Sequence, residues 1–337
     1  MELRKNVSLK PYNTFGIDVQ ASHFVEVRSV DTLREALALE GVPPPFILGG
    51  GSNLLLTGPL KALVLYINIP GKEIVREAGN EVVLRVMAGE NWHELVMWSL
   101  RQGFGGLENL SLIPGKAGTA PIQNIGAYGV ELKDVFQSCE ALDMASGKLR
   151  RFDREACRFG YRDSFFKREG KGKYIIVSVD FRLTRKEHQL HTSYGDLQKE
   201  LQAAGITNPG PPDVARAVIA IRQRKLPDPA QLGNSGSFFK NPVIPQTLYD
   251  DLKKQFPELP GYLQDGGEVK VPAGWLIERC GFKGFRQGDA GVHEHQALVL
   301  VNYGRASGQE ILGLSLDIRK AVLREYSIAL QPEVNVI

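Results

Sequence analysis

The sequence predicts an α+β protein with a two-lobed unit over about the first 210 residues and a smaller α/β domain after it. A strand–helix–strand pattern near the N-terminus runs into a glycine loop at Gly49 to Asn53. A strongly alternating strand follows at Ile175 to Leu183, and the proline-rich segment Asn208 to Pro212 marks a linker. A chain of 337 residues is also too long for one compact core, which favours more than one domain.

The first part contains alternating helix and strand signals. Asp31 to Glu40 has the spacing of a short amphipathic helix, and Phe46 to Leu48 has the composition of the strand that leads into the glycine loop. Val82 to Met87 predicts a second strand, and Asn91 to Gln102 predicts a helix. The alternation of Ile175 to Leu183 is typical of a half-buried strand.

The second part begins after the linker. We expect Asp213 to cap a helix with Val214, Val218 and Ile221 on one face and a basic last turn. Ser307 and Glu310 have the spacing of a capping box for the last helix. The predicted boundaries are residues 1–65 for the first lobe, 66–210 for the second lobe, 211–328 for the smaller domain and 329–337 for a C-terminal tail.

Composition excludes several classes of protein. The 41 basic and 38 acidic residues give a formal charge of only +3, which argues against nucleic acid as a partner. Cys139, Cys157 and Cys280 are too widely spaced for a disulfide framework or a CxxC metal site. The N-terminus lacks an apolar signal core, and no run reaches membrane-spanning length, so we expect a cytoplasmic protein without membrane insertion.

Two glycine-rich loops offer backbone N–H groups to an anion. The first, Gly49 to Asn53, provides consecutive amides plus the side chains of Ser52 and Asn53, which is a nest suited to a phosphate or diphosphate. The second, Ile113 to Gly129, is long enough to cover an extended cofactor. Neither loop is a GxGxxG fingerprint or a P-loop, which disfavours a Rossmann domain and a P-loop NTPase. Each loop taken singly also fits a surface turn, but the pair favours a long diphosphate cofactor.

The segment Gly233 to Pro242 places a serine, a lysine and an asparagine around two aromatic residues. Its small residues let the backbone pass close to a ligand, and its final proline ends the segment. A glycine turn that leads into a buried edge strand fits the same residues. The catalytic interpretation therefore depends on the two loops upstream and on the C-terminus.

Taken together, these segments resemble the flavoprotein family of UDP-N-acetylenolpyruvoylglucosamine reductases. The matching blocks occur in family order over essentially the whole chain: Asn13 to Gly16, Gly49 to Asn53, Ala88 to Trp92, Ile113 to Gly129, Cys157 to Ser164, Lys225 to Pro229, Gly236 to Pro242, Ala273 to Ile277, His295 to Val299 and Pro332 to Val334. Tyr194 to Leu197 resembles the longer type of the family, which folds a tyrosine-bearing loop over the substrate.

The resemblance implies a two-lobed FAD-binding domain of the vanillyl-alcohol-oxidase/PCMH type and a smaller substrate-binding domain. It implies FAD as cofactor and NADPH as co-substrate. The hydride would pass through the flavin to the vinyl carbon of UDP-N-acetylglucosamine enolpyruvate and give UDP-N-acetylmuramate for peptidoglycan synthesis. The implied cofactor-binding residues lie in the two loops: Gly49, Gly50, Gly51, Ser52, Asn53, Pro114, Gly115, Gly118, Thr119, Gln123, Asn124, Gly126, Ala127 and Tyr128.

Three residues carry the implied catalysis. Arg162 would bind the substrate carboxylate and stabilise the enolate that forms, and Ser237 would protonate carbon. Glu333 would stabilise the enolate oxygens if it is protonated or shared with Arg162. The ordinary alternatives are a surface ion pair for Arg162 and a solvated tail for Glu333.

The resemblance also implies substrate contacts, which fall on Tyr161, Tyr194, Lys225, Asn241 and Gln296. As a point charge, Lys225 suits a phosphate, and the ring of Tyr194 would exclude water. The ordinary alternatives are a cation at a helix C-terminus for Lys225 and a packing aromatic for Tyr194. We expect a monomer that acts on small molecules.

Two rival functions remain open. One is an FAD oxidase of the same fold that acts on another alcohol or sugar, and the other is a non-catalytic UDP-sugar-binding protein. A metal enzyme is disfavoured, because His93 begins a zinc-protease-like helix that has Met97 where the second histidine is needed. His293 and His295 have no further ligand cluster near them in the sequence, so no metal site is expected.

Overall fold

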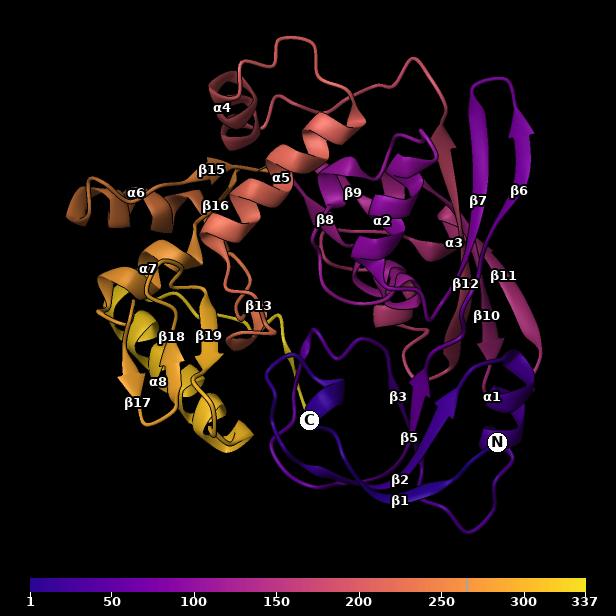
Figure 1. Ribbon diagram of the computed structural model, residues 1–337. Helices are drawn as coiled ribbons and strands as arrows, with labels where there is room; N and C mark the ends of the chain where they lie inside the picture. Colours follow the sequence, from indigo (N-terminus) through magenta and orange to yellow (C-terminus); the bar gives the residue numbers. More distant parts are fainter. Residues whose placement is uncertain (265) are drawn as a thin grey trace. The chain divides into compact units, whose positions relative to one another are not determined.

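The computed structural model describes residues 1–264 and 266–337, and the chain divides into two compact units (Figure 1). The first unit consists of Met1–Val7, Ala21–Gly50 and Lys61–Arg224. The second unit consists of Ser8–Gln20, Gly51–Leu60 and Lys225–Ile337. Two short N-terminal segments thus belong to the unit built mainly from the C-terminal third. The consecutive domain boundaries proposed from the sequence stay predictions.

The first lobe of the first unit is a four-stranded sheet. Its strands, in spatial order, are β1 (Arg4–Ser8), β2 (Gln20–Val27), β5 (Leu60–Ile67) and β3 (Pro45–Leu48). Strand β3 confirms the strand predicted at Phe46 to Leu48 and runs parallel to β5, with Leu48 opposite Tyr66. Helix α1 (Val30–Leu37) follows the N-cap Ser29 and ends before the predicted Glu40, because the N–H of Ala38 already closes its last turn.

The second lobe is a five-stranded antiparallel sheet. Its spatial order is β11 (Leu149–Asp153), β10 (Phe136–Asp143), β12 (Tyr174–Thr184), β7 (Glu81–Met87) and β6 (Lys72–Ala78). Strands β7 and β12 confirm the predicted strands, but the prediction that β12 is half-buried is wrong. Seven consecutive residues of β12 are buried, because the strand is central and packs against a hydrophobic cluster on each face.

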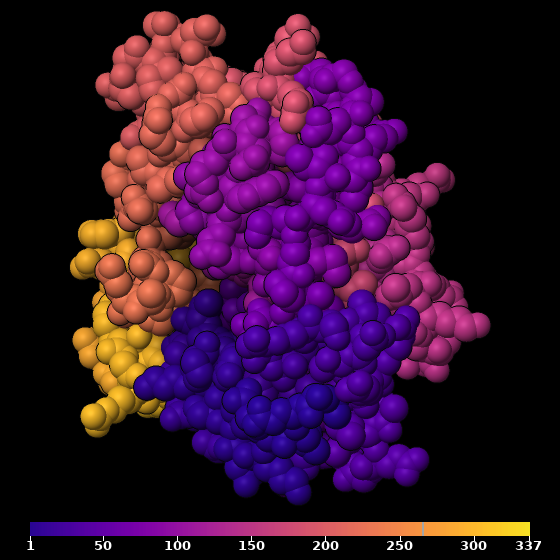
Figure 2. Space-filling view, turned by 45° about the vertical axis from the view of Figure 1, so that its right-hand side comes forward, coloured from indigo at the N-terminus to yellow at the C-terminus, as the bar shows by residue number. Residues whose placement is uncertain are grey.

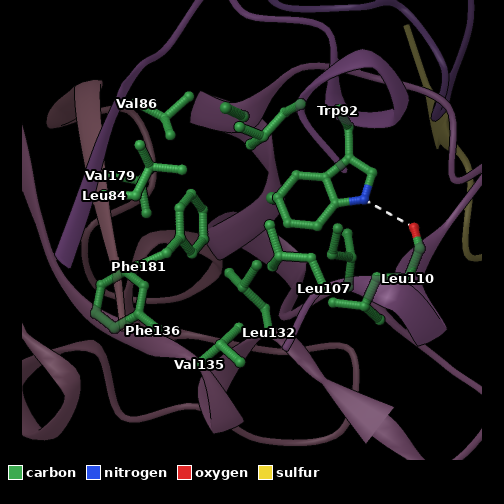
Figure 3. Close-up of a cluster of buried hydrophobic side chains, with 14 of the residues drawn as sticks. Leu84, Val86, Trp92, Leu107, Leu110, Leu132, Val135, Phe136, Val179 and Phe181 are labelled. Carbon is green, nitrogen blue, oxygen red and sulfur yellow. Dashed lines mark hydrogen bonds between the residues drawn. The ribbon is translucent and has the colours of Figure 1, made fainter. Parts of the chain in front are cut away.

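One face of this sheet packs against α2 (Trp92–Arg101), which confirms the predicted helix with Asn91 as its N-cap. The Trp92 side chain is 1% exposed, and its ring meets the Phe181 ring edge-on at 5.7 Å between centroids. Its Nε1 donates a hydrogen bond to Leu110 O at 2.9 Å (Figure 3). A buried aromatic of this size contributes about 3–5 kcal/mol to stability.

A second hydrophobic cluster joins the two lobes of this unit. Leu33 and Leu65 of the first lobe pack with Ala88, Leu142 and Val177 of the second lobe. In the space-filling view the indigo surface of the first lobe accordingly lies against the purple surface of the second (Figure 2). The lobes therefore share a core.

Two helices complete the first unit: α4 (Gly195–Ala203) and α5 (Pro211–Lys225). Leu197, Val218 and Ile221 form the apolar contact between them, against which Tyr128 packs. The prediction that Asp213 caps α5 is wrong, since the helix begins two residues earlier. The prolines at its start need no N–H partner, and the Asp213 carboxylate instead accepts a hydrogen bond from Gly210 N at 2.8 Å.

The second unit contains a sheet whose spatial order is β13 (Gly233–Ser237), β19 (Val299–Asn302), β18 (Ala290–Val292) and β17 (Arg286–Gln287). Its helices are α7 (Ala273–Arg279) and α8 (Gly308–Tyr326). The predicted capping box of α8 is confirmed, because the Ser307 and Glu310 side chains each bond the other residue's backbone N–H. Strand β13 lies at the edge of this sheet, which agrees with the edge strand expected within Gly233 to Pro242.

A three-stranded sheet also belongs to this unit, in the order β14 (Val243–Pro245), β16 (Glu268–Lys270) and β15 (Tyr262–Leu263), with α6 (Gln246–Gln255) against it. The C-terminal strand β20 (Asn335–Val336) pairs in parallel with β4 (Leu54–Leu55).

The remaining elements are short: η1 (Lys10–Tyr12), η2 (Glu108–Leu110), η3 (Ala117–Gln123), β8 (Gly126–Ala127), β9 (Val130–Glu131), η4 (Leu132–Asp134), α3 (Arg154–Cys157) and η5 (Phe165–Lys167). Within the part of the chain that the structure describes, no helix is long and apolar enough to cross a membrane.

Candidate active site

The two predicted cofactor loops touch each other through glycines in the first unit. A Cβ added to Gly50 would lie 2.8 Å from Gly115 Cα, and one added to Gly49 would lie 2.3 Å from Thr119 Cγ2. Real Cβ atoms essentially never come that close to another atom. Glycine is therefore required at Gly50, where the two main chains meet, and Gly49 leaves room for the Thr119 side chain; together the two loops form a glycine cradle.

The second loop is fixed to the strand and helix before it by backbone hydrogen bonds. Gly115 O accepts from Trp92 N at 3.0 Å, and Ala117 N donates to Glu90 O at 2.9 Å. Gly118 N donates to Ala88 O at 3.1 Å. The loop is thus preformed by the core of the second lobe.

One predicted cofactor residue, Asn124, has a mainly structural side chain. It is fully buried in the left-handed region at φ 44°. Its amide donates to Glu131 and to Gly160 O, and its Oδ1 accepts from Lys133 N. Any contact of Asn124 with a cofactor would therefore come from its main chain.

Arg162 is held in a strained backbone conformation at φ 53°. Its Nη2 donates to Gly126 O at 2.8 Å, and its guanidinium lies 5.5 Å from the ring centroid of Tyr161. Lys167 Nζ donates to Arg162 O at 3.0 Å. A Cβ at Gly126 would lie 3.1 Å from Arg162 Nη1, so this glycine makes room for the guanidinium.

A second arginine of this region, Arg222, was not among the sequence-predicted site residues. Burial lowers the pKa of its guanidinium, and the nearby Arg162 lowers it further, whereas Tyr128 acts in the opposite direction. Its Nε is buried and has no hydrogen-bond partner among residues 1–264 and 266–337. Two neighbouring guanidinium groups repel each other, so this arrangement favours an anion between or beside them.

The sequence contained a signal for Arg222. It follows Val218 by four residues on α5, so it lies on the same side of the helix as that buried residue and is itself half-buried. Sequence reasoning instead assigned it to the basic last turn that complements the helix dipole.

Tyr194 and Tyr128 form an aromatic pair in the same unit. Their rings meet edge-on with 5.7 Å between centroids, and Tyr194 is 53% exposed. Burial raises the pKa of Tyr128, which keeps its hydroxyl protonated and able to donate. The exposed ring of Tyr194 is therefore available to cover a ligand held at the second loop.

In the second unit, the C-terminal tail lies beside the Ser237 segment. Glu333 N donates to Phe238 O at 2.8 Å, and Lys240 N donates to Gln331 O at 3.0 Å. Phe238 is fully buried and anchors the strand, whereas Ser237 itself is exposed. The geometry thus presents the serine hydroxyl at the surface of an edge strand.

The same tail contacts the end of the first glycine loop. Asn53 Nδ2 donates to Glu333 O at 3.3 Å, and Asn335 N donates to Asn53 O at 3.2 Å. Gly51, which precedes Asn53, has φ 62°, and a Cβ there would lie 2.0 Å from Tyr12 O. Asn53, Glu333 and the Ser237 segment are therefore brought together in one unit.

The other sequence-predicted substrate residues of this unit support its fold. Asn241 Oδ1 accepts from Ala273 N at 3.0 Å, at the first residue of α7, and Gln296 Oε1 accepts from Leu298 N at 3.4 Å. Lys225 is the last residue of α5, where its charge also complements the helix dipole.

Comparison with known proteins gives the same two-part organisation. Residues 21–153 match a family described as an FAD binding domain. Residues 228–337 match a family described as the C-terminal domain of UDP-N-acetylenolpyruvoylglucosamine reductase. The predicted fold class, an FAD-binding domain followed by a smaller C-terminal domain, is confirmed.

Full-length relatives match as well. UDP-N-acetylenolpyruvoylglucosamine reductase of Flavobacterium johnsoniae is 53% identical, covering 100% of both chains. The protein of the same name from Pseudomonas aeruginosa is 53% identical over 99% of both chains. The crystal structure of the reductase from Thermus caldophilus superimposes with a TM-score of 0.67 at 25% identity, over 100% of this chain and 99% of that one. The chain therefore belongs to the UDP-N-acetylenolpyruvoylglucosamine reductase family.

Proposed function

We propose that this chain catalyses the NADPH-dependent reduction of UDP-N-acetylglucosamine enolpyruvate to UDP-N-acetylmuramate, a step in peptidoglycan precursor synthesis, with FAD as its cofactor. The observation that carries this proposal is the 53% identity, over its full length, to a reductase of that name. The glycine cradle and the three candidate catalytic residues fit the same reaction.

The cradle fits an extended dinucleotide. The close approach of Gly49 and Gly50 to the second loop brings the two glycine-rich main chains together, so that amides of both loops could bind one diphosphate. We assign FAD to the residues Gly49 to Asn53 and Pro114 to Tyr128. Bound there, FAD would accept hydride from NADPH and deliver it to the vinyl carbon of the substrate.

Arg162 and Arg222 supply positive charge. We assign Arg162 to the substrate carboxylate, where its fork would hold two oxygens and stabilise the charge that develops as the enolate forms. Arg222 strengthens the local positive potential, since its half-buried side chain acts electrostatically on the same site as that of Arg162.

Ser237 is the proposed proton donor to the α-carbon. A serine hydroxyl is a weak acid, so this role requires a fixed position next to a strongly basic enolate. The buried Phe238 and the bond from Glu333 N to Phe238 O fix the strand beside it. The Glu333 carboxyl would stabilise the enolate oxygens in its protonated form or when shared with Arg162.

The remaining substrate contacts are proposed for Tyr161, Tyr194, Lys225, Asn241 and Gln296. The half-exposed ring of Tyr194 would cover the substrate diphosphate, and Lys225 would bind it as a point charge. We also propose a monomer that acts in the cytoplasm, where sugar nucleotides and NADPH are present, and that has no nucleic-acid partner, in keeping with its charge of only +3.

Stopped-flow measurement of the two half-reactions tests the proposal. In Ser237→Ala we expect flavin reduction by NADPH to keep its rate, and reoxidation by the enolpyruvyl sugar nucleotide to slow by at least about 100-fold. Ser235→Ala is the matched control, because the contacts of the Ser235 hydroxyl are long: 3.4 Å to Leu54 O and 3.5 Å to Thr14 Oγ1. Unchanged reoxidation in Ser237→Ala would remove the serine from the mechanism.

A further inference from the structure

Lys116 belongs to the second cofactor loop, yet its side chain extends into the first lobe. The residue is only 8% exposed. Its Nζ donates to Ile67 O at 2.7 Å and to Asn68 Oδ1 at 2.8 Å. The same nitrogen lies 3.7 Å from the ring centroid of Tyr66, so the ammonium group is bound by two oxygens and an aromatic face.

These contacts link the second cofactor loop to the strands that hold the first cofactor loop. Tyr66 lies opposite Leu48 in the parallel pairing of β3 with β5, and Leu48 directly precedes Gly49. On the other side, Lys116 O accepts from Thr119 Oγ1 at 2.8 Å, and the methyl group of Thr119 lies where a Cβ on Gly49 would be. One lysine thus fixes the backbone on both sides of the cradle.

The positive charge of Lys116 is only partly balanced by the protein. The carboxylate of Glu26 acts on Lys116 and is connected to it through Asn68, whose Nδ2 donates to Glu26 Oε1 at 2.6 Å. Glu26 also forms an ion pair with Arg28, with 3.0 Å between Nε and Oε1, and the positive charge of Arg4 further lowers the pKa of Glu26. Burial lowers the pKa of Lys116 to about 8, although Glu26 acts to raise it.

Glu90, an acidic residue beside this part of the loop, is already paired. Glu90, whose backbone O accepts from Ala117 N, forms an ion pair with Lys72 and accepts from Gly71 N at 2.7 Å. It therefore offers little additional charge to Lys116. An anion held in the cradle would supply the missing counter-charge.

We propose that Lys116 is a positioning residue for FAD, whose ammonium group holds the two glycine loops in register and links diphosphate binding to the uptake or retention of a proton. This inference rests on the proposed function, since it takes FAD as the ligand of the cradle. A diphosphate favours the protonated lysine, so by linkage the protonated protein binds FAD more tightly. Above pH 8 the neutral amine loses the cation–π contact and the charge-assisted hydrogen bonds, and FAD affinity falls.

The test is the pH dependence of the FAD dissociation constant, measured by fluorescence titration of flavin-free full-length protein. We expect the wild type to bind FAD at least about tenfold more weakly at about pH 9.5 than at about pH 7, with the affinity beginning to fall near pH 8, the pKa of Lys116 in the flavin-free protein. Lys116→Met should bind weakly at both pH values. Lys61→Met, which removes an exposed lysine of the same strand β5, should follow the wild type.

The outcomes separate this inference from the proposed function. A wild-type affinity that is tight and independent of pH overturns the role of Lys116 and leaves FAD binding intact. A pH dependence that survives in Lys116→Met also overturns it. Absence of FAD binding at every pH overturns the proposed function itself. If Lys116→Met does not fold, the pH profile of the wild type and the behaviour of Lys116→Arg test the inference instead. Lys116→Arg keeps the positive charge at both pH values, so it should bind FAD tightly at both.

Discussion

Substitution of Gly50 by alanine tests the glycine cradle directly. The new Cβ would lie 2.8 Å from Gly115 Cα and 3.1 Å from Gly115 C. The two loops would have to separate by about 0.6 Å to reach 3.4 Å, where ordinary contact begins. Overpacking of this kind costs about 1–3 kcal/mol.

The strain can lower either the FAD affinity or the free energy of unfolding. If the loops separate, the amides no longer converge on the diphosphate. FAD affinity then falls by about 5- to 150-fold when the whole cost falls on binding. If the loops stay together, the free energy of unfolding of the flavin-free protein falls instead. We expect the two losses together to reach about 1–3 kcal/mol.

The assay combines FAD titration with urea unfolding of the flavin-free protein. Gly58→Ala is the matched control, since a Cβ at Gly58 would meet nothing within 4 Å. If Gly50→Ala equals this control in both FAD affinity and unfolding free energy, the close approach of Gly50 to Gly115 is refuted.

Three further predictions concern stability. Ser307→Ala removes one half of the α8 capping box and should lower the free energy of urea unfolding by about 0.5–2 kcal/mol, and no loss would contradict the cap. Trp92→Phe loses the Nε1 bond to Leu110 O and some core volume, so calorimetry should give a lower Tm, equivalent to about 1–3 kcal/mol, with the fold retained. Burial lowers the pKa of His93, and Arg222 lowers it further, so the unfolded chain takes up this proton first as the pH falls. Unfolding free energy should therefore fall from about pH 7.5 to about pH 5.5, less steeply in His93→Gln, and equal slopes would contradict the assignment.

Local signals in the sequence were sufficient for many elements. The capping box at Ser307 and the strand before Gly49 both depend on neighbouring residues, and both are correct. The burial of both faces of β12 was not predicted, because Ser178 and Asp180 give the strand an alternating pattern although both are buried. Asp180 is tolerated there because it forms an ion pair with Arg85.

The positions of several site residues could not be predicted, because they depend on contacts between residues far apart in the sequence. The bond from Asn53 to Glu333 O spans 280 residues, and no local pattern indicates that the tail meets the first loop. The contact of Lys116 with the ring of Tyr66 is likewise not visible in the local sequence, and Tyr66 lies near the first loop only because β5 pairs with β3. Arg222 does lie in the last turn of α5, but its proximity to Arg162 depends on distant parts of the chain and could not be predicted from local sequence.

The central claim is that this chain passes hydride from NADPH through FAD to the enolpyruvyl sugar nucleotide. An anaerobic absorbance titration tests it most directly: NADPH is added first, and the enolpyruvyl substrate is added second. We expect the oxidised-flavin band to bleach with NADPH and to return with the substrate. Bleaching without return would contradict the substrate assignment and favour another oxidoreductase of this fold, and the absence of a flavin band after reconstitution with FAD would contradict the whole account.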